Sequence, residues 1–211
     1  MKNYIKDNMK LYNRDCMEGM AEYPDNYFDL AIVDPPYGLE RFKSGGSHVN
    51  KHGDENKDWN NVKPSKEYFE ELMRVSNHQI IWGANNFELP TSEYFVVWKK
   101  GNALDFSFAM VEQAWTNVKK PAKIFELLHS QSGEQRMHPT QKPVKLYSWL
   151  LQNYSSPEHK ILDTHLGSAS HAIAWHYFQK GGEFVGYELD SEYFEKSIAR
   201  IKQETAQISM F

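Results

Sequence analysis

The amino-acid sequence predicts an α/β fold in which a mostly parallel sheet carries helices on both faces. Short apolar segments, such as 28–33 and 183–187, alternate along the chain with segments of helical periodicity, such as 65–75 and 191–205. The chain has 211 residues, which is enough for one sizeable domain with a full core, and neither a repeat nor a linker divides it. We therefore expect a single domain over residues 1–211.

The first half of the chain is expected to form strands 9–13, 28–33, 79–82, 94–98 and 108–115 and helices 17–23 and 65–75. A turn at Pro24-Asp25-Asn26 separates the first helix from the second strand. Ser65 is a suitable N-cap for the second helix, which has an apolar stripe. Segment 39–63 contains Gly45-Gly46 and few apolar positions, so we expect a mobile loop there.

The second half of the chain is expected to form strands 160–162 and 183–187 and helices 143–154, 169–179 and 191–205. Pro143 suits the first turn of a helix, where its missing N–H costs nothing. Gly181-Gly182 ends the next helix, because glycine readily takes the left-handed conformation of a C-terminal cap.

Composition excludes several classes of protein. The formal net charge of -4 rules out a uniformly basic nucleic-acid binder, although a local basic patch remains compatible with it. A single cysteine, Cys16, excludes an intramolecular disulfide and a multi-cysteine zinc site. Residues 1–10 lack the apolar core of a signal peptide, and no apolar run reaches the roughly 20 residues of a membrane span. We expect a cytoplasmic protein without a metal site.

The most informative stretch is Asp34-Pro35-Pro36-Tyr37, which directly follows the apolar run Leu30–Val33. Ligands of open α/β sheets bind at the carboxyl ends of the strands, where this stretch is expected to lie. An acid and an aromatic ring on stiff backbone suit a flat ring that bears an amine. These side chains are what the methylation of an amino group on a nucleic-acid base requires.

A second unit, Asp163 to Glu188, has the pattern of strand, loop, helix and strand, with an acid at each strand end. Its loop contains Gly167, which lets a ligand approach the backbone closely, and an acid at the second strand end often binds ribose hydroxyls. The loop lacks the three-glycine fingerprint of a dinucleotide site. An adenosine-type ligand without pyrophosphate therefore fits better, and a plain βαβ unit is the alternative.

Three motifs together resemble the beta class of DNA amino-methyltransferases that use S-adenosylmethionine, in particular small DPPY-type adenine methylases of phage and prophage type. Asp34–Tyr37 matches the catalytic (D/N/S)PP(Y/F) motif, and His138–Pro143 matches HPTQKP. Residues 163–170, with the sequence DTHLGSAS, resemble the cofactor motif DPFxGSGT. The catalytic motif comes first and the cofactor motif last, which is the permuted order of the beta class. The resemblance covers nearly the whole chain.

This resemblance implies a Rossmann-like methyltransferase domain with a catalytic half over about 1–130 and a cofactor-binding half over about 131–205. It implies catalytic roles for Asp34, Pro35, Pro36 and Tyr37. It also implies that the cofactor contacts lie among Asp15, Cys16, Asp34, Thr140, Gln141, Lys142, Asp163, His165, Gly167, Ser168, Ser170 and Glu188. For Asp15 the alternative is a helix cap, and for Cys16 it is buried packing.

The chain departs from the family pattern within the cofactor motif. Thr164 and His165 replace Pro and Phe, and Ala169 replaces Gly. His165 could stack near the cofactor as the Phe does, or it could be an ordinary loop histidine. Sequence recognition must be compact, because only a short segment separates the last expected strand of the first half from His138.

The activity implied is site-specific methylation of the 6-amino group of an adenine flipped out of DNA, within a restriction-modification system or a phage. Asp34 and the Pro35 carbonyl would accept the two amine hydrogens, and Tyr37 would stack on the base. The alternatives are the 4-amino group of cytosine and a non-catalytic DNA-binding module on the same scaffold. RNA or protein amines also remain open as substrates.

Basic residues that could neutralise DNA phosphates fall in two groups. Arg41, Lys43, Lys51 and Lys57 lie in segment 39–63, and Lys99, Lys100, Lys119, Lys120 and Lys123 follow other expected strands. The alternative for each of them is solvated surface.

Two further partners follow from resemblance alone. Gln207–Phe211 resembles the QL(S/D)LF peptide that binds the bacterial sliding clamp, with a final helical turn as the alternative. Beta-class relatives are often dimers, so a homodimer is a further expectation, although no interface can be read from the sequence.

Overall fold

The computed structural model describes residues 2–38, 63–100, 109–127, 133–134 and 141–206. The strands are β1 (Asn3–Lys6), β2 (Met9–Tyr12), β3 (Phe28–Val33), β4 (Ser76–Trp82), β5 (Phe95–Lys99), β6 (Val111–Thr116), β7 (Lys123–Glu126), β8 (Lys160–Asp163) and β9 (Glu183–Tyr187). The helices are α1 (Cys16–Met20), α2 (Lys66–Val75), the 3-10 helix η4 (Ala84–Asn86), α3 (Val144–Tyr154), α4 (Ser170–Phe178) and α5 (Ser191–Ala206).

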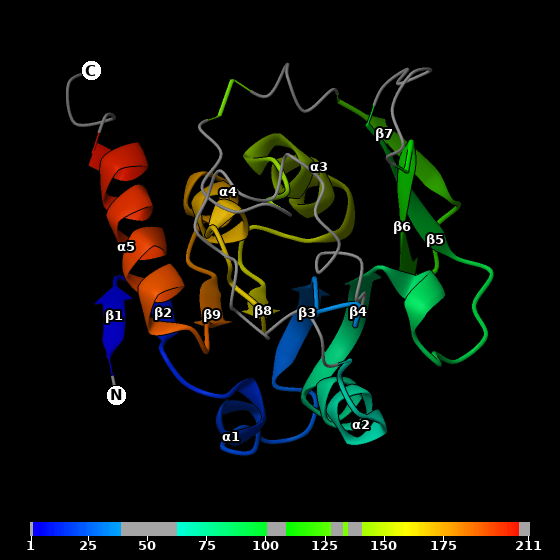
Figure 1. The fold of residues 1–211 in the computed structure, drawn as a ribbon, viewed down its shortest axis with the longest axis horizontal. Coiled ribbons are helices and arrows are strands. Elements are labelled where there is room, and N and C mark those ends of the chain that lie inside the picture. The colour runs from blue at the N-terminus through cyan, green and yellow to red at the C-terminus, as the bar shows by residue number, and fades with distance from the viewer. Residues whose placement is uncertain (1, 39–62, 101–108, 128–132, 135–140, 207–211) are drawn as a thin grey trace, which may run out of the picture.

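Within the described residues, all strands join one sheet in the order β1-β2-β9-β8-β3-β4-β6-β5-β7, which runs from left to right across Figure 1 as far as β5. The five central strands, from β2 to β4, pair in parallel, and β5 pairs with β7 in parallel. The antiparallel pairs are β1 with β2 and β6 with both β4 and β5. The mostly parallel sheet expected from the sequence is confirmed.

Strand β3 shows how the two faces of the sheet are covered. Leu30 and Ile32 belong to one core cluster, which also contains buried side chains of α3, α4 and α5. Ala31 and Val33 point to the other face and belong to a second cluster, with Met20 of α1 and Leu72 of α2. Because both faces are buried, β3 is a continuous apolar run, as expected for a central parallel strand. Helices therefore cover both faces, as the sequence predicts.

The predicted and observed elements differ mainly at edges. The edge strands β1 and β7 were not expected, because most of their side chains are exposed and their sequences do not alternate. Helix α1 is Cys16–Met20 rather than 17–23, and β4 begins at Ser76 rather than at residue 79. Lys123 was expected to follow a strand, but it is the first residue of β7. The loop expected over 39–63 lies outside the described residues except for Lys63.

No helix among the described residues is both long and apolar enough to cross a membrane.

Helix α1 approaches β9 at Gly19. A Cβ atom at Gly19 would lie 2.2 Å from the ring of Tyr187, a side chain with no exposed surface. We predict that Gly19→Ala lowers the free energy of unfolding by about 1–3 kcal/mol, because the buried ring must move. Urea denaturation measures this change. Glu18→Gln, at an exposed neighbouring position, is the control, with a change expected within about 0.5 kcal/mol. Equal stability of the two variants would contradict the predicted contact.

Candidate active site

The residues predicted to be functional gather at the carboxyl edge of the central strands. Asp34 follows β3, Asp163 ends β8 and Glu188 follows β9. These three strands are neighbours and run in parallel, so their carboxyl ends meet at one edge of the sheet. The sequence separates the three acids widely, and the sheet brings them together.

The Asp34 carboxylate accepts hydrogen bonds from two side chains. The Tyr37 hydroxyl donates to Oδ1 at 2.6 Å, and Lys142 Nζ donates to Oδ2 at 2.5 Å. Lys142 lies just before α3, and only 3% of its side chain is exposed. The motif at 34–37 and the end of the motif at 138–143 therefore meet at one carboxylate. The family resemblance assigns Lys142 to the cofactor, whereas the structure places its ammonium on Asp34.

Glu112, on β6, is a site residue that the sequence analysis missed. One oxygen of Glu112 lies 3.1 Å from Lys142 Nζ, and the other pairs with Lys100. Charges of alternating sign thus run from Asp34 through Lys142 and Glu112 to Lys100. Glu112 could not be recognised from the sequence, because a single acidic residue in a short strand belongs to no motif. Its position opposite Lys142 arises only when β6 joins the sheet.

Burial and the neighbouring charges act against each other in this chain of charges. Burial raises the pKa of Asp34, and the adjacent Lys142 ammonium opposes that rise only in part. Burial alone would lower the pKa of Lys142, but attraction to Asp34 and Glu112 raises it above its usual range. Burial would also raise the pKa of Glu112, but Lys142 and Lys100 bring it down to about 2. Glu112 is therefore ionised and Lys142 charged at neutral pH.

Strand β4 holds the Tyr37 ring in place. Gly83 follows β4 with a φ of 70°, and a Cβ atom there would lie 2.2 Å from the Tyr37 ring. Phe87, just after η4, packs edge-on against Tyr37 with ring centroids 6.0 Å apart. Phe69 of α2 supports Phe87 in turn, at 5.1 Å. The close approach at Gly83 explains why a residue without a side chain follows this strand.

The Glu188 carboxylate closes the glycine loop. It accepts the backbone N–H of Gly167 at 2.9 Å and that of Asp190 at 2.9 Å. Burial raises the pKa of Glu188 to about 7, against the lowering effect of these two hydrogen bonds. The next side chain, Leu189, is 69% exposed, which is unusual for a large apolar residue. Glu188 and Gly167 were both predicted as site residues, and the structure brings them into contact.

Asp163 holds the glycine loop through both oxygens of its carboxylate. Its Oδ1 accepts the backbone N–H of His165 at 3.0 Å, and its Oδ2 lies 3.0 Å from Nδ1 of the buried His171. Both oxygens thus contact the protein itself, so Asp163 orients the loop. His171 in turn stacks on Tyr147 of α3, with ring centroids 4.7 Å apart.

His165 occupies the place of the family's Phe. Burial lowers its pKa to about 4, so the ring is neutral at neutral pH. Its Nδ1 lies 2.9 Å from Thr164 Oγ1, and its ring meets the edge of Tyr68 at 5.6 Å. The hydroxyl of Tyr68 contacts Thr164 Oγ1 at 2.6 Å. Thr164 and His165, two of the departures from the family motif, thus contact each other and the same tyrosine of α2.

Arg200 of α5 contacts both the glycine loop and the segment that contains Glu134. It donates to the carbonyl of Ser168 at 2.9 Å and to Ser170 Oγ at 2.9 Å. Its other nitrogen pairs with Glu134 at 2.8 Å, and Glu134 also accepts the backbone N–H of Val144 at 2.8 Å. The arginine therefore links the glycine loop to the start of α3. Sequence alone did not indicate it, because the contact depends on how α5 packs.

Comparison with known proteins identifies the family. A family model described as DNA methylase, of the N6/N4 type, matches residues 79–200, which is more than half of the chain. The chain belongs to this family of DNA methylases.

Relatives of the methylase agree with this assignment. It is 24% identical over 208 residues to YubD of Escherichia coli (strain K12), named as a methylase, and covers 87% of that protein. Its fold is similar to the crystal structure of the M1.HpyAVI–SAM complex, with a TM-score of 0.61, 19% identity and coverage of 93% of this chain and 98% of the other. It is also similar to the cytosine-N4-specific PvuII DNA methyltransferase, with a TM-score of 0.63, 14% identity and coverage of 96% and 92%.

The first two cofactor candidates of the methylase have local structural roles. Asp15 caps α1, because its Oδ1 accepts the backbone N–H of Met17 at 2.7 Å. Cys16 is partly buried against the second core cluster, and burial raises the pKa of its thiol to about 12. The alternatives considered for both residues, a helix cap and packing, are thus present in the fold.

Among the basic residues predicted to meet DNA, Lys99 pairs with Glu126 at 2.6 Å, and Lys100 pairs with Glu112. Both lysines therefore have acidic partners within the methylase. Arg41, Lys43, Lys51 and Lys57 lie outside the described residues, as do Thr140 and the tail Gln207–Phe211. Among the residues that are described, no cluster of His, Cys, Asp and Glu could hold a metal ion.

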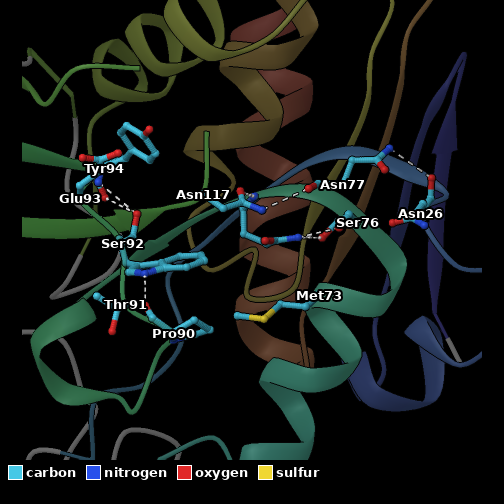
Figure 2. Close-up of a pocket in the computed structure, with 12 residues that line it drawn as sticks. Asn26, Met73, Ser76, Asn77, Pro90, Thr91, Ser92, Glu93, Tyr94 and Asn117 are labelled. Carbon is cyan, nitrogen blue, oxygen red and sulfur yellow. Dashed lines mark hydrogen bonds between the residues drawn. The ribbon is translucent and has the colours of Figure 1, made fainter. Parts of the chain in front are cut away.

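A cavity of about 610 Å³ lies at the opposite end of β4, near Ser76 (Figure 2). Its side-chain amides bond to neighbouring backbone: Asn117 Nδ2 to the carbonyl of Asn77 at 3.2 Å, and Asn77 Nδ2 to that of Asn26 at 3.4 Å. Asp34 and Glu188 lie at the other edge of the sheet. The cavity is therefore separate from the candidate active site.

The ion pair between Arg200 and Glu134 joins a buried arginine to a partly buried glutamate, with exposed fractions of 6% and 13% for the two side chains. We predict that Arg200→Met lowers the free energy of unfolding by about 3–5 kcal/mol, because Glu134 loses its buried partner. Chemical denaturation measures this loss. The control is Lys196→Met in the same helix, which breaks the exposed pair with Glu192 and should cost less than about 1 kcal/mol. Similar losses of unfolding free energy in both variants would show that the Arg200–Glu134 pair stabilises the fold no more than the exposed pair does.

Proposed function

We propose that this methylase transfers a methyl group from S-adenosylmethionine to the exocyclic 6-amino group of an adenine flipped out of DNA. The observation that carries the proposal is the position of the Asp34 carboxylate at the same edge of the sheet as the loop closed by Glu188. The two residues follow strands β3 and β9, which are separated only by β8. Two strand spacings amount to about 10 Å, a distance that a nucleoside-sized cofactor can bridge.

The residues around Glu188 fit the adenosine part of S-adenosylmethionine. An ionised Glu188 can accept hydrogen bonds from ribose hydroxyls. A Cβ atom added at Gly167 would approach no side chain, and only the His165 carbonyl at 3.8 Å, so the loop has room for a ligand. The exposed Leu189 offers an apolar surface for one face of the adenine ring. Ser168 and Ser170 hold the loop through Arg200 rather than facing outward.

The catalytic residues of this proposal position an amine. Asp34 accepts one amine hydrogen and the Pro35 carbonyl accepts the other, so the nitrogen lone pair is turned toward the methyl donor. These acceptors also stabilise the positive charge that develops on the nitrogen. Tyr37 supplies a flat face for the base, and its hydroxyl orients Asp34 through the 2.6 Å hydrogen bond.

S-adenosylmethionine supplies a methyl group on a sulfonium: the C–S bond breaks with its electron pair left on sulfur, and a C–N bond forms. The nitrogen then loses one proton to water, and a neutral methylamino group results. Asp34 does not need to be a strong base for this, because the methylated nitrogen is already acidic. The amine of a paired base is stacked and hydrogen-bonded, so the base must leave the duplex first.

Cytosine N4 methylation is the second candidate, because the cytosine-N4-specific PvuII methyltransferase has a similar fold at a TM-score of 0.63. Asp34, at a position where cytosine enzymes commonly carry Ser, favours adenine. Several expectations stay predictions. They are the binding of DNA phosphates by Arg41, Lys43 and Lys51 and the docking of Gln207–Phe211 on the sliding clamp. A homodimer, a cytoplasmic location and a role in restriction-modification also stay predictions.

We predict that Asp34→Asn lowers the rate of methyl transfer to DNA at least about 100-fold, since the amine loses its charged acceptor. Mass spectrometry of digested DNA measures N6-methyladenine and N4-methylcytosine separately and so also decides between the two bases. Calorimetry measures the affinity of the variant for S-adenosylmethionine, so that a loss of cofactor binding is separated from a loss of methyl transfer. Asp25→Asn, at an exposed residue paired with Arg74, is the control and should keep full activity. Wild-type rates in Asp34→Asn would refute the mechanism.

We further predict that affinity for S-adenosylmethionine rises from pH 6 to pH 8. Glu188 has a pKa of about 7, so below that pH it is largely protonated and accepts ribose hydroxyls poorly. Each pH unit below the pKa should weaken binding up to about tenfold. Glu188→Gln does not titrate and serves as the reference, because titration of the cofactor's own groups affects both proteins equally. Identical pH profiles for the two proteins would exclude Glu188 from the ribose site.

A further inference from the structure

Both oxygens of Asp34 already accept hydrogen bonds, from Tyr37 and Lys142. A target amine that binds Asp34 Oδ2 must displace or crowd the Lys142 ammonium. That ammonium also disfavours the reaction, because positive charge develops on the nitrogen beside it. The same contact that keeps Asp34 in place thus competes with the substrate for it.

Lys142 has little access to water, so it cannot simply release Asp34 into solvent. Its side chain is 3% exposed, and the rings of Trp82 and Tyr37 lie 5.3 and 5.9 Å from Nζ. A buried ammonium that leaves one carboxylate requires another acceptor nearby. Glu112 is such an acceptor, since its oxygen is already 3.1 Å from Nζ. Lys100 pairs with the other Glu112 oxygen and holds this carboxylate in place.

We propose that Glu112 is a positioning residue for methyl transfer: it takes over the Lys142 ammonium when the target amine binds and so frees Asp34 Oδ2 to accept an amine hydrogen. Lys142 needs to move only slightly, because it already lies between the two carboxylates. Glu112 also balances the Lys142 charge next to the reacting nitrogen. This inference rests on the proposed function, since it assumes that Asp34 accepts an amine.

The test compares Glu112→Gln with Glu126→Gln. Glu126 is a matched control, because it pairs with Lys99 on neighbouring strands but is not in contact with Lys142. We expect Glu112→Gln to lower kcat for DNA methylation at least about tenfold, with little change in affinity for S-adenosylmethionine. Glu112→Asp keeps the charge and should recover much of the rate. Glu126→Gln should match the wild type.

A double-mutant cycle with Lys142→Met shows whether Glu112 acts through Lys142. If Glu112 only receives the ammonium, Glu112→Gln should cost nothing further once Lys142 has no charge. The pH profile gives a second readout: loss of Glu112 lowers the pKa of Lys142, so the rate of Glu112→Gln should rise at alkaline pH more than that of the wild type. A purely structural role would change neither readout.

Three results would overturn the inference while leaving the proposed function intact: a wild-type kcat in Glu112→Gln, an equal loss in the Lys142→Met background, or an identical alkaline profile. A wild-type protein that methylates no base amine would instead refute the proposed function. If Glu112→Gln does not fold, a crystal structure of the wild type with a flipped target base decides. Lys142 Nζ on Glu112 supports the inference, and Nζ still bound to Asp34 Oδ2 refutes it.

Discussion

The parallel pairing of β3 with β8 and β4 is the constraint on which the rest of the structure depends. It places Asp34, Asp163 and Gly83 at one edge of the sheet, although the sequence separates them widely. Because β3 is buried on both faces, a shift of one residue would turn its apolar side chains toward the wrong clusters. Hydrophobic burial on both faces therefore favours the register that places Asp34 at this edge.

Around this rigid edge, each polar group of the site is held by a different element. Tyr37 rests on Gly83 after β4, Glu188 closes the loop at Gly167, and Arg200 reaches that loop from α5. Such a division of support favours preorganisation, since no single loop must carry the geometry. Through Arg200, α5 also contributes to the candidate active site, although it lies far from Asp34 along the chain.

The sequence predicted most of the fold but only some of the residues that meet at the candidate site. The central strands were predictable because their apolar runs have strand length, and Asp34 and Glu188 because they follow such runs. The edge strands β1 and β7 were not, since exposed strands carry no burial pattern. Glu112 and Arg200 escaped prediction for another reason: their partners, Lys142 and Ser168, are close only in space. Lys142 itself was recognised by motif but assigned to the cofactor.

The burial of the charges between Asp34 and Glu112 has a consequence for ionic strength. Dissolved ions screen exposed charges within about 8–10 Å at physiological salt, but they penetrate poorly to an ammonium that is 3% exposed. Contacts with DNA phosphates, in contrast, weaken steeply as salt rises. Salt therefore acts on the encounter of this methylase with DNA and has little effect on the charges around Asp34, so that DNA binding and the electrostatics at Asp34 respond to different properties of the solution.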